Sequence, residues 1–161
     1  MDERLKPLHD VLSLNTRLFF SCLQDVDDAA AQKRMDAHAN SAAFIAVHLV
    51  DARRFLAEYL GVPPQRLPAE LLPEARSVED VREYPTLDCL GETWRFVSVV
   101  LRERLSDLSG EELNAPSSRS FPIEDGSVLG GIAFMLQHES YHIGQLSLLR
   151  RLLGFPPMSY F

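Results

Sequence analysis

The sequence predicts an all-α protein, a four-helix bundle in a single domain that spans residues 1–161. Four segments of about 20 residues repeat apolar side chains at three- and four-residue spacing, the pattern of helices that bury one face. No segment alternates apolar and polar residues as a half-buried strand does. A chain of 161 residues is long enough for one domain with a hydrophobic core, and four long helices in such a domain favour a bundle.

The first two helices are expected over residues 3–24 and 41–60. Asn40 can cap the second helix, and Gly61 supplies its C-terminal stop just before a pair of prolines. Each helix carries one apolar stripe with a polar exception. The first stripe comprises Leu5, Leu8, Leu12, Asn15, Phe19 and Leu23, and the second comprises Ser41, Ile45, His48, Ala52, Phe55 and Tyr59.

The third helix is expected over residues 86–108, and the fourth from Ser127 or Val128 to Leu153. Gly154 ends the fourth helix, with two prolines shortly behind it. The third helix carries its apolar face on Leu87, Leu90, Trp94, Val97, Leu101 and Leu108.

Two connections are expected to be irregular. The stretch VPPQRLPAELLPEARSVEDVREYP is long and proline-rich, and loops of this kind cross the end of a bundle or help to shape a site. Within it, Ser77 and Asp80 resemble a capping box and predict one short helical piece. The stretch SGEELNAPSSRSFPIEDGS is the second irregular connection, and a polar, Ala-rich stretch also precedes the second helix.

Composition and charge favour a soluble globular protein, with 46% apolar residues, 24% charged residues and a net charge of −7. Acidic residues are spread along the chain and only two lysines are present, so a nucleic acid partner is not expected. No apolar run could span a membrane, and MDERLKPLHD lacks a secretory apolar region, so we expect a cytoplasmic protein. Cys22 and Cys89 form no C-x-x-C pair and are expected to be buried free thiols.

Three histidines fall on the inward-facing stripes of two helices. His138 and His142 are four residues apart in the fourth helix, so their Cβ atoms lie about 5–6 Å apart on one face. His48 holds a similar position in the second helix. Three neutral imidazoles with open positions are the ligand set of a catalytic-type divalent site, whereas hydrogen-bonded core histidines without a metal are the alternative. His9 and His38 are expected to have surface or capping roles.

His138, Glu139 and His142 also spell H-E-x-x-H, the signature of zinc peptidases. Such enzymes need a third metal ligand, commonly further along the chain. The chain after His142 reads IGQLSLLRRLLGFPPMSYF and contains no His, Asp or Glu, so a peptidase is disfavoured. Helical geometry then puts Glu139 at the margin of the site or against a neighbouring chain, as a general base, a second-sphere group or a surface carboxylate.

The stretch HESYHIGQLSLLRRLLGFPP resembles the C-terminal motif of the DinB/YfiT-like superfamily, H-x-x-x-H-x-G-Q followed by an Arg-bearing amphipathic tail. NSAAFIAVHLVDARRFLAEYLG resembles the other motif of that superfamily. The resemblance implies an up-down-down-up four-helix bundle, with the long connection after Gly61 as its crossover. It also implies a divalent metal held by His48, His138 and His142, in a superfamily where both zinc and nickel occur. Imidazole ligands also suit iron and copper. Glu139 is not one of the required ligands.

The resemblance implies a metal-dependent enzyme that activates a thiol or a water molecule, because characterised relatives include transferases and isomerases that use low-molecular-weight thiols. The reaction would be S-transferase-like or hydrolase-like, on a small-molecule substrate that the sequence does not identify. A stress-related bundle that binds a metal or ligand without turnover is the alternative, and a bundle with no metal is a further one.

Three polar residues are candidates to support the metal ligands: Gln145 one turn beyond His142, Asn15 in the first stripe, and Tyr141. The fourth helix is apolar on almost every side, so a partner is expected to bury it, and we expect a homodimer. The interface is expected on this helix or its small-residue flank, which comprises Gly130, Ala133, Ser140, Gly144 and Ser147, with Ile132, Leu136 and Ile143 on a further side.

Overall fold

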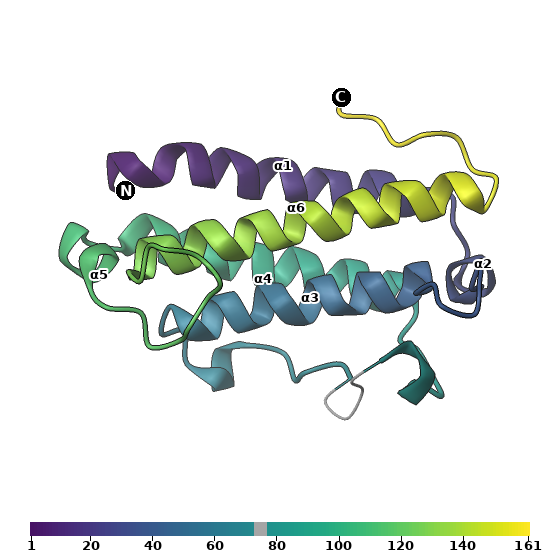
Figure 1. The fold of residues 1–161 in the computed structure, drawn as a ribbon, viewed down its shortest axis with the longest axis horizontal. Helices are drawn as coiled ribbons and strands as arrows, with labels where there is room; N and C mark the ends of the chain where they lie inside the picture. The colour runs from purple at the N-terminus through teal and green to yellow at the C-terminus, as the bar shows by residue number, and fades with distance from the viewer. Residues whose placement is uncertain (73–76) are drawn as a thin grey trace.

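The computed structural model describes residues 1–72 and 77–161, and these residues fold into helices without a strand (Figure 1). The predicted all-α class is confirmed. The proline-rich connection predicted after Gly61 includes residues 73–76, which lie outside the described residues. The described elements are η1 Glu3–Leu5, α1 Lys6–Leu23, α2 Asp28–Gln32, α3 Ala42–Tyr59, η2 Pro64–Arg66, η3 Val78–Asp80, α4 Leu87–Asp107, α5 Gly110–Asn114 and α6 Val128–Leu152.

The four long helices α1, α3, α4 and α6 begin and end within three residues of the positions predicted from the sequence. Gly61 has a φ of +87° just beyond α3, the left-handed conformation that ends a helix and that glycine adopts without strain. The predicted cap of α3 is wrong by one residue. Ser41, rather than Asn40, caps the helix by accepting a hydrogen bond from the backbone N–H of Phe44 at 3.1 Å.

Two short helices lie in stretches that were expected to lack them. Asp27 caps α2, and Ser109 caps α5 through a reciprocal capping box with Glu112. The Ser-x-x-Glu spacing of that box is a local sequence signal for the start of α5. The predicted capping box of Ser77 and Asp80 is confirmed, and it begins η3.

The long helices lie side by side along the long axis of the molecule (Figure 1). Helix α6 packs between α1 and α3, and α4 packs chiefly against α3. In Figure 1, α1 and α6 run from left to right, whereas α3 and α4 run in the opposite direction. No helix among residues 1–72 and 77–161 is both long and apolar enough to cross a lipid bilayer.

The core consists of two apolar clusters with a polar layer between them. One cluster includes Leu12 and Leu136, and the other includes Phe19 and Ile143. Each long helix supplies side chains to both clusters, and each supplies a polar side chain to the layer that separates them. The layer comprises Asn15 and Thr16 of α1, Arg53 of α3, Ser98 of α4, and Glu139 and Ser140 of α6.

The centre of this layer is a buried ion pair between Arg53 and Glu139, whose side chains are 0% and 1% exposed. Arg53 donates from Nε to Oε1 of Glu139 at 2.8 Å and from Nη2 to Oε2 at 2.6 Å. Its Nη1 donates to Thr16 and Ser98, and its guanidinium lies 3.4 Å from the ring centroid of Trp94. A charged pair withdrawn from water stabilises a fold only when its remaining polar atoms are also satisfied, as they are here.

We expect Arg53→Met to lower the free energy of unfolding by about 3–5 kcal/mol, because it leaves the Glu139 carboxylate buried without its cation. The double variant Arg53→Met/Glu139→Leu should lose much less, since no buried charge is left unpaired. Urea unfolding followed by circular dichroism measures both values.

Glu58→Gln is the matched control, because it breaks the exposed pair in which Arg54 Nη1 lies 3.1 Å from the Glu58 carboxylate. That pair should contribute less than about 1 kcal/mol. Equal losses from Arg53→Met and Glu58→Gln would contradict a dominant buried pair.

Candidate metal centre

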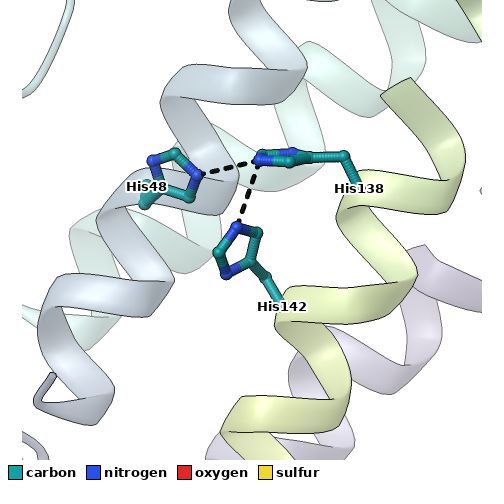
Figure 2. A group of neighbouring side chains, drawn as sticks. All are labelled: His48, His138 and His142. Carbon is teal, nitrogen blue, oxygen red and sulfur yellow. Dashed lines mark hydrogen bonds between the residues drawn. The ribbon is translucent and has the colours of Figure 1, made fainter. Parts of the chain in front are cut away.

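The structure brings together three imidazoles from distant parts of the chain (Figure 2). His48 precedes His138 by 90 residues and His142 by 94. His48 projects from α3, while His138 and His142 project from successive turns of α6. The Nε2 atom of His138 lies 3.3 Å from Nε2 of His48 and 3.1 Å from Nε2 of His142. All three side chains are half-buried, and each offers a ring nitrogen to the same point.

The spacing of these nitrogens suits a shared divalent cation. Two imidazoles bound tetrahedrally to zinc at about 2.0–2.1 Å place their nitrogens about 3.3 Å apart. Hydrogen bonds alone fit less well, because His138 Nε2 carries either one hydrogen or one lone pair, and so only one of its two contacts can be a normal hydrogen bond. The geometry therefore favours a metal site over a cluster of hydrogen-bonded core histidines.

The surroundings keep the three imidazoles neutral, which is the form that binds a metal. Burial lowers the pKa of His48 to about 4, with further lowering by the charges of His142 and His138. Burial likewise lowers the pKa of His138, more than the nearby Glu139 raises it. The pKa of His142 is lowered by burial and partly restored by its hydrogen bond to Gln145. At neutral pH each ring therefore keeps one nitrogen whose lone pair is free to bind a metal.

Gln145 orients one of the three rings. Its Oε1 accepts a hydrogen bond from Nδ1 of His142 at 2.7 Å, which leaves the Nε2 lone pair of His142 pointing into the cluster. The Gln145 amide nitrogen donates in turn to the Tyr141 hydroxyl at 3.1 Å. The ring of Tyr141 lies edge-on to His142, and the Tyr141 side chain is 58% exposed.

His138 differs from His142 in its second ring nitrogen. The Nδ1 atom of His138 is buried and has no hydrogen-bond partner within the described part of the chain. The ring lies beside Phe134, with 6.2 Å between the ring centroids. A metal-binding histidine usually donates its other N–H to an acceptor. His142 does so through Gln145, whereas the ring of His138 is held in place by packing.

The expected position of Glu139 at the margin of the site or on the surface is wrong. Its carboxylate lies in the core, where both oxygens accept from Arg53. Asn15, a second candidate to support the ligands, also belongs to this layer and donates to Glu139 Oε2 at 3.3 Å. Neither residue makes a hydrogen bond to the histidines in the described structure, and both oxygens of the Glu139 carboxylate are engaged by Arg53.

The remaining candidates lie outside the cluster. His9 is half-buried on α1, and His38 is exposed in the segment before α3.

Cys22 is buried as predicted, and burial raises its pKa to about 11, which makes its thiol a poor nucleophile. Cys89 is exposed, so the prediction of a second buried thiol is wrong. It is the third residue of α4, where its side chain points away from the core stripe that its apolar neighbours suggested.

The fold and the site together define a helical protein with a three-histidine cluster of the kind that holds a divalent metal. The family model of the DinB superfamily matches residues 12–146, a span that contains all three histidines and Gln145. The chain belongs to the DinB superfamily, which confirms the resemblance read from its last helix. No curated protein matches the sequence.

We expect Gln145→Ala to weaken metal binding by about 10- to 100-fold, because His142 loses the acceptor that fixes its ring and tautomer. Competition against a chelating dye measures the affinity. Gln137→Ala is the matched control, since Gln137 is an exposed glutamine on the same helix. Equal affinities in the two variants would contradict an orienting role for Gln145.

Proposed function

We propose that this protein is a divalent-metal-dependent enzyme whose three-histidine centre activates a thiol or a water molecule. The observation that carries the proposal is the convergence of three Nε2 atoms, with that of His138 lying 3.3 Å from His48 and 3.1 Å from His142. Burial also lowers the pKa values of the histidines, which favours their neutral form. His48, His138 and His142 would hold the ion. Zinc or nickel fits this imidazole set best, although iron or another transition metal is also compatible with it.

A metal ion held by three neutral imidazoles lowers the pKa of a bound thiol or water toward 7 and polarises a bound carbonyl group. The protein's own residues supply the remaining requirements. Gln145 fixes the ring of His142, and the Arg53–Glu139 pair fixes the helical turn that carries His138. With a low-molecular-weight thiol as cosubstrate the reaction is S-transferase-like, and with water it is hydrolase-like.

The second candidate is a stress-related bundle that binds a metal or a ligand without turnover. It is favoured by one observation: among the described residues, the candidate metal group contains histidines alone, and the nearest carboxylate candidate is held by Arg53. A protein with no base at its metal centre can still activate a thiol, because a metal-bound thiol loses its proton without one. For that reason the thiol-dependent reaction is preferred to the hydrolase.

We further propose the up-down-down-up topology for α1, α3, α4 and α6. The directions of these helices in Figure 1 support it. This topology makes α3 and α6 antiparallel neighbours, so residues that precede His48 lie near residues that follow His142.

Elemental analysis of protein purified without a histidine tag tests the proposal. We expect about one zinc or nickel ion per chain and its loss in His138→Ala, because two imidazoles alone make a much weaker site. His9→Ala should keep the metal, since His9 lies outside the cluster. Wild-type protein without stoichiometric metal would sink the proposal, whatever its stability.

We also propose that two copies pair through the exposed strip of α6 around Gly144. Ile132, Leu136 and Ile143 offer no surface to a partner, because they are at most 2% exposed and are buried within their own chain. What supports pairing is Gly144 itself: a Cβ atom there would meet nothing within 4 Å. A glycine inside a helix costs about 1 kcal/mol relative to alanine, and close approach of a second helix would account for it.

We expect Gly144→Arg to convert a dimer into a monomer while the fold and the metal content are kept. The side chain has room within one chain, whereas a partner helix in close contact would clash with it. Light scattering at micromolar concentration measures the mass. Ser106→Arg, at an exposed position on α4, should leave the dimer intact. A wild-type monomer, or a dimeric Gly144→Arg variant, would contradict this interface.

A further inference from the structure

A cavity of about 280 Å³ lies at one end of the three-histidine cluster. Its walls come from the N-terminal turn of α3, about the last two turns of α6 and the segment that precedes α3. Pockets that hold whole drug-sized ligands span about 300–1,000 Å³, so this one suits a small molecule or one arm of a larger one. The lining residues are Met35, His38, Ala39, Asn40, Ile45, Gln145, Leu148, Leu149 and Leu152.

The cavity and the cluster share a wall. Gln145 lines the cavity and also accepts the hydrogen bond from His142. Ile45 lies three residues before His48 on α3, about one helical turn from that ligand. Since α3 and α6 run in opposite directions in Figure 1, Ile45 and Gln145 both lie toward the same end of the cluster. A molecule with one end at the histidines therefore has the cavity directly beside it.

The outer wall is an organised segment. Arg34 donates from Nε to the carbonyl oxygen of Ala39 at 2.8 Å and from Nη2 to the carbonyl oxygen of Ala37. The same guanidinium pairs with Glu79 at 2.7 Å, which ties this segment to the crossover connection. Asp36 accepts from the backbone N–H of His38 at 2.8 Å. The segment is thus shaped before any ligand arrives, which lowers the cost of binding.

The lining is mostly apolar, with His38, Asn40 and Gln145 as its polar side chains. Among its described residues there is no Asp, Glu, Lys or Arg, so an ionised group would enter without a counter-ion. Met35, Leu148 and Leu152 are 44%, 59% and 51% exposed, and contact with an apolar ligand would remove part of this surface from water. Asn40 and Gln145 add neutral hydrogen-bonding groups to the lining.

A larger hollow of about 550 Å³ lies between α1, α4 and the C-terminal residues. None of its described lining residues is a histidine or Gln145, so it has no shared wall with the cluster. The smaller cavity is the one placed to serve the chemistry.

We propose that this cavity binds an uncharged aliphatic arm of the substrate whose reactive head lies at the three-histidine centre. The assignment of the arm to a substrate rests on the proposed function, whereas the affinity of the cavity for an aliphatic chain does not. His38, for which the sequence predicted a surface or capping role, becomes part of the binding site together with Met35. The chemical class is a compact aliphatic thiol acceptor or thiol, neutral along its arm.

The first test uses metal-free protein and the series 1-butanol, 1-pentanol and 1-hexanol, followed by nuclear magnetic resonance. The affinity should rise about three- to fourfold for each added methylene, the value for burying a CH₂ group. The shifted signals should be the side-chain amide of Gln145 and the methyl groups of Ile45 and Leu149. Shifts confined to other regions, or affinities independent of chain length, would overturn the proposal.

Leu152→Glu places a charge at the rim of the cavity and should abolish the increase with chain length. Leu152 is half-exposed at the end of α6, so the fold should tolerate the change. Val99→Glu is the matched control, because Val99 is equally exposed, at 51%, but lies on α4 outside the cavity lining. An unchanged alcohol series in Leu152→Glu would also overturn the proposal.

The second test uses metal-loaded protein with 1-butanethiol, 1-pentanethiol and 1-hexanethiol, followed by the absorption of the cobalt-substituted site. The same three- to fourfold increase per methylene is expected, and Leu152→Glu should remove it. Thiols that bind the metal without any dependence on chain length would overturn the role of the cavity and leave the proposed function standing. Failure to bind metal would sink the proposed function, and the alcohol series alone would then decide whether the cavity binds an aliphatic arm.

Discussion

The buried Arg53–Glu139 ion pair is the constraint on which the position of the three-histidine cluster depends. Its desolvation is offset only while the pair also keeps its bonds to Thr16 and Ser98, so all four long helices must hold one axial alignment. Arg53 follows His48 by five residues on α3, and Glu139 directly follows His138 on α6. A slide of one residue along either helix, about 1.5 Å, would break the pair and separate the histidines together.

This dependence explains why Glu139, which completes the letters of a peptidase motif, pairs with Arg53 in the core. In H-E-x-x-H the glutamate points about 100° away from the first histidine, and in this bundle that direction leads into the core. Its negative charge is cancelled by Arg53 over two hydrogen bonds. The three imidazoles contribute no charge of their own, so a divalent ion among them keeps its full charge. That electrostatic balance favours an anionic ligand such as a thiolate over a neutral one.

Sequence patterns within single helices predicted most of the fold, but they did not predict which side chains pair between helices. Apolar periodicity located α1, α3, α4 and α6, and four-residue spacing put His138 beside His142, because both depend on neighbours within one helix. The partner of Glu139 is 86 residues away, and no feature of the sequence around Arg53 identifies it. The exposure of Cys89 was not predicted for the same reason, because burial depends on which face of a helix packs against another helix.

Helix α6 shows why hydrophobicity alone gave an incomplete account of its surroundings. One face, with Ile132 and Ile143, is buried within the chain, and a second, with Leu148 and Leu149, borders the cavity beside the histidines. The apolar character of a residue does not by itself distinguish a position in the core from a position that contacts a ligand. The exposed side of α6 around Gly144 is the surface that the proposed dimer would use. In the proposed dimer, the absence of a side chain at Gly144 would let two helices approach closely, and close approach increases the surface that a pair of helices can bury.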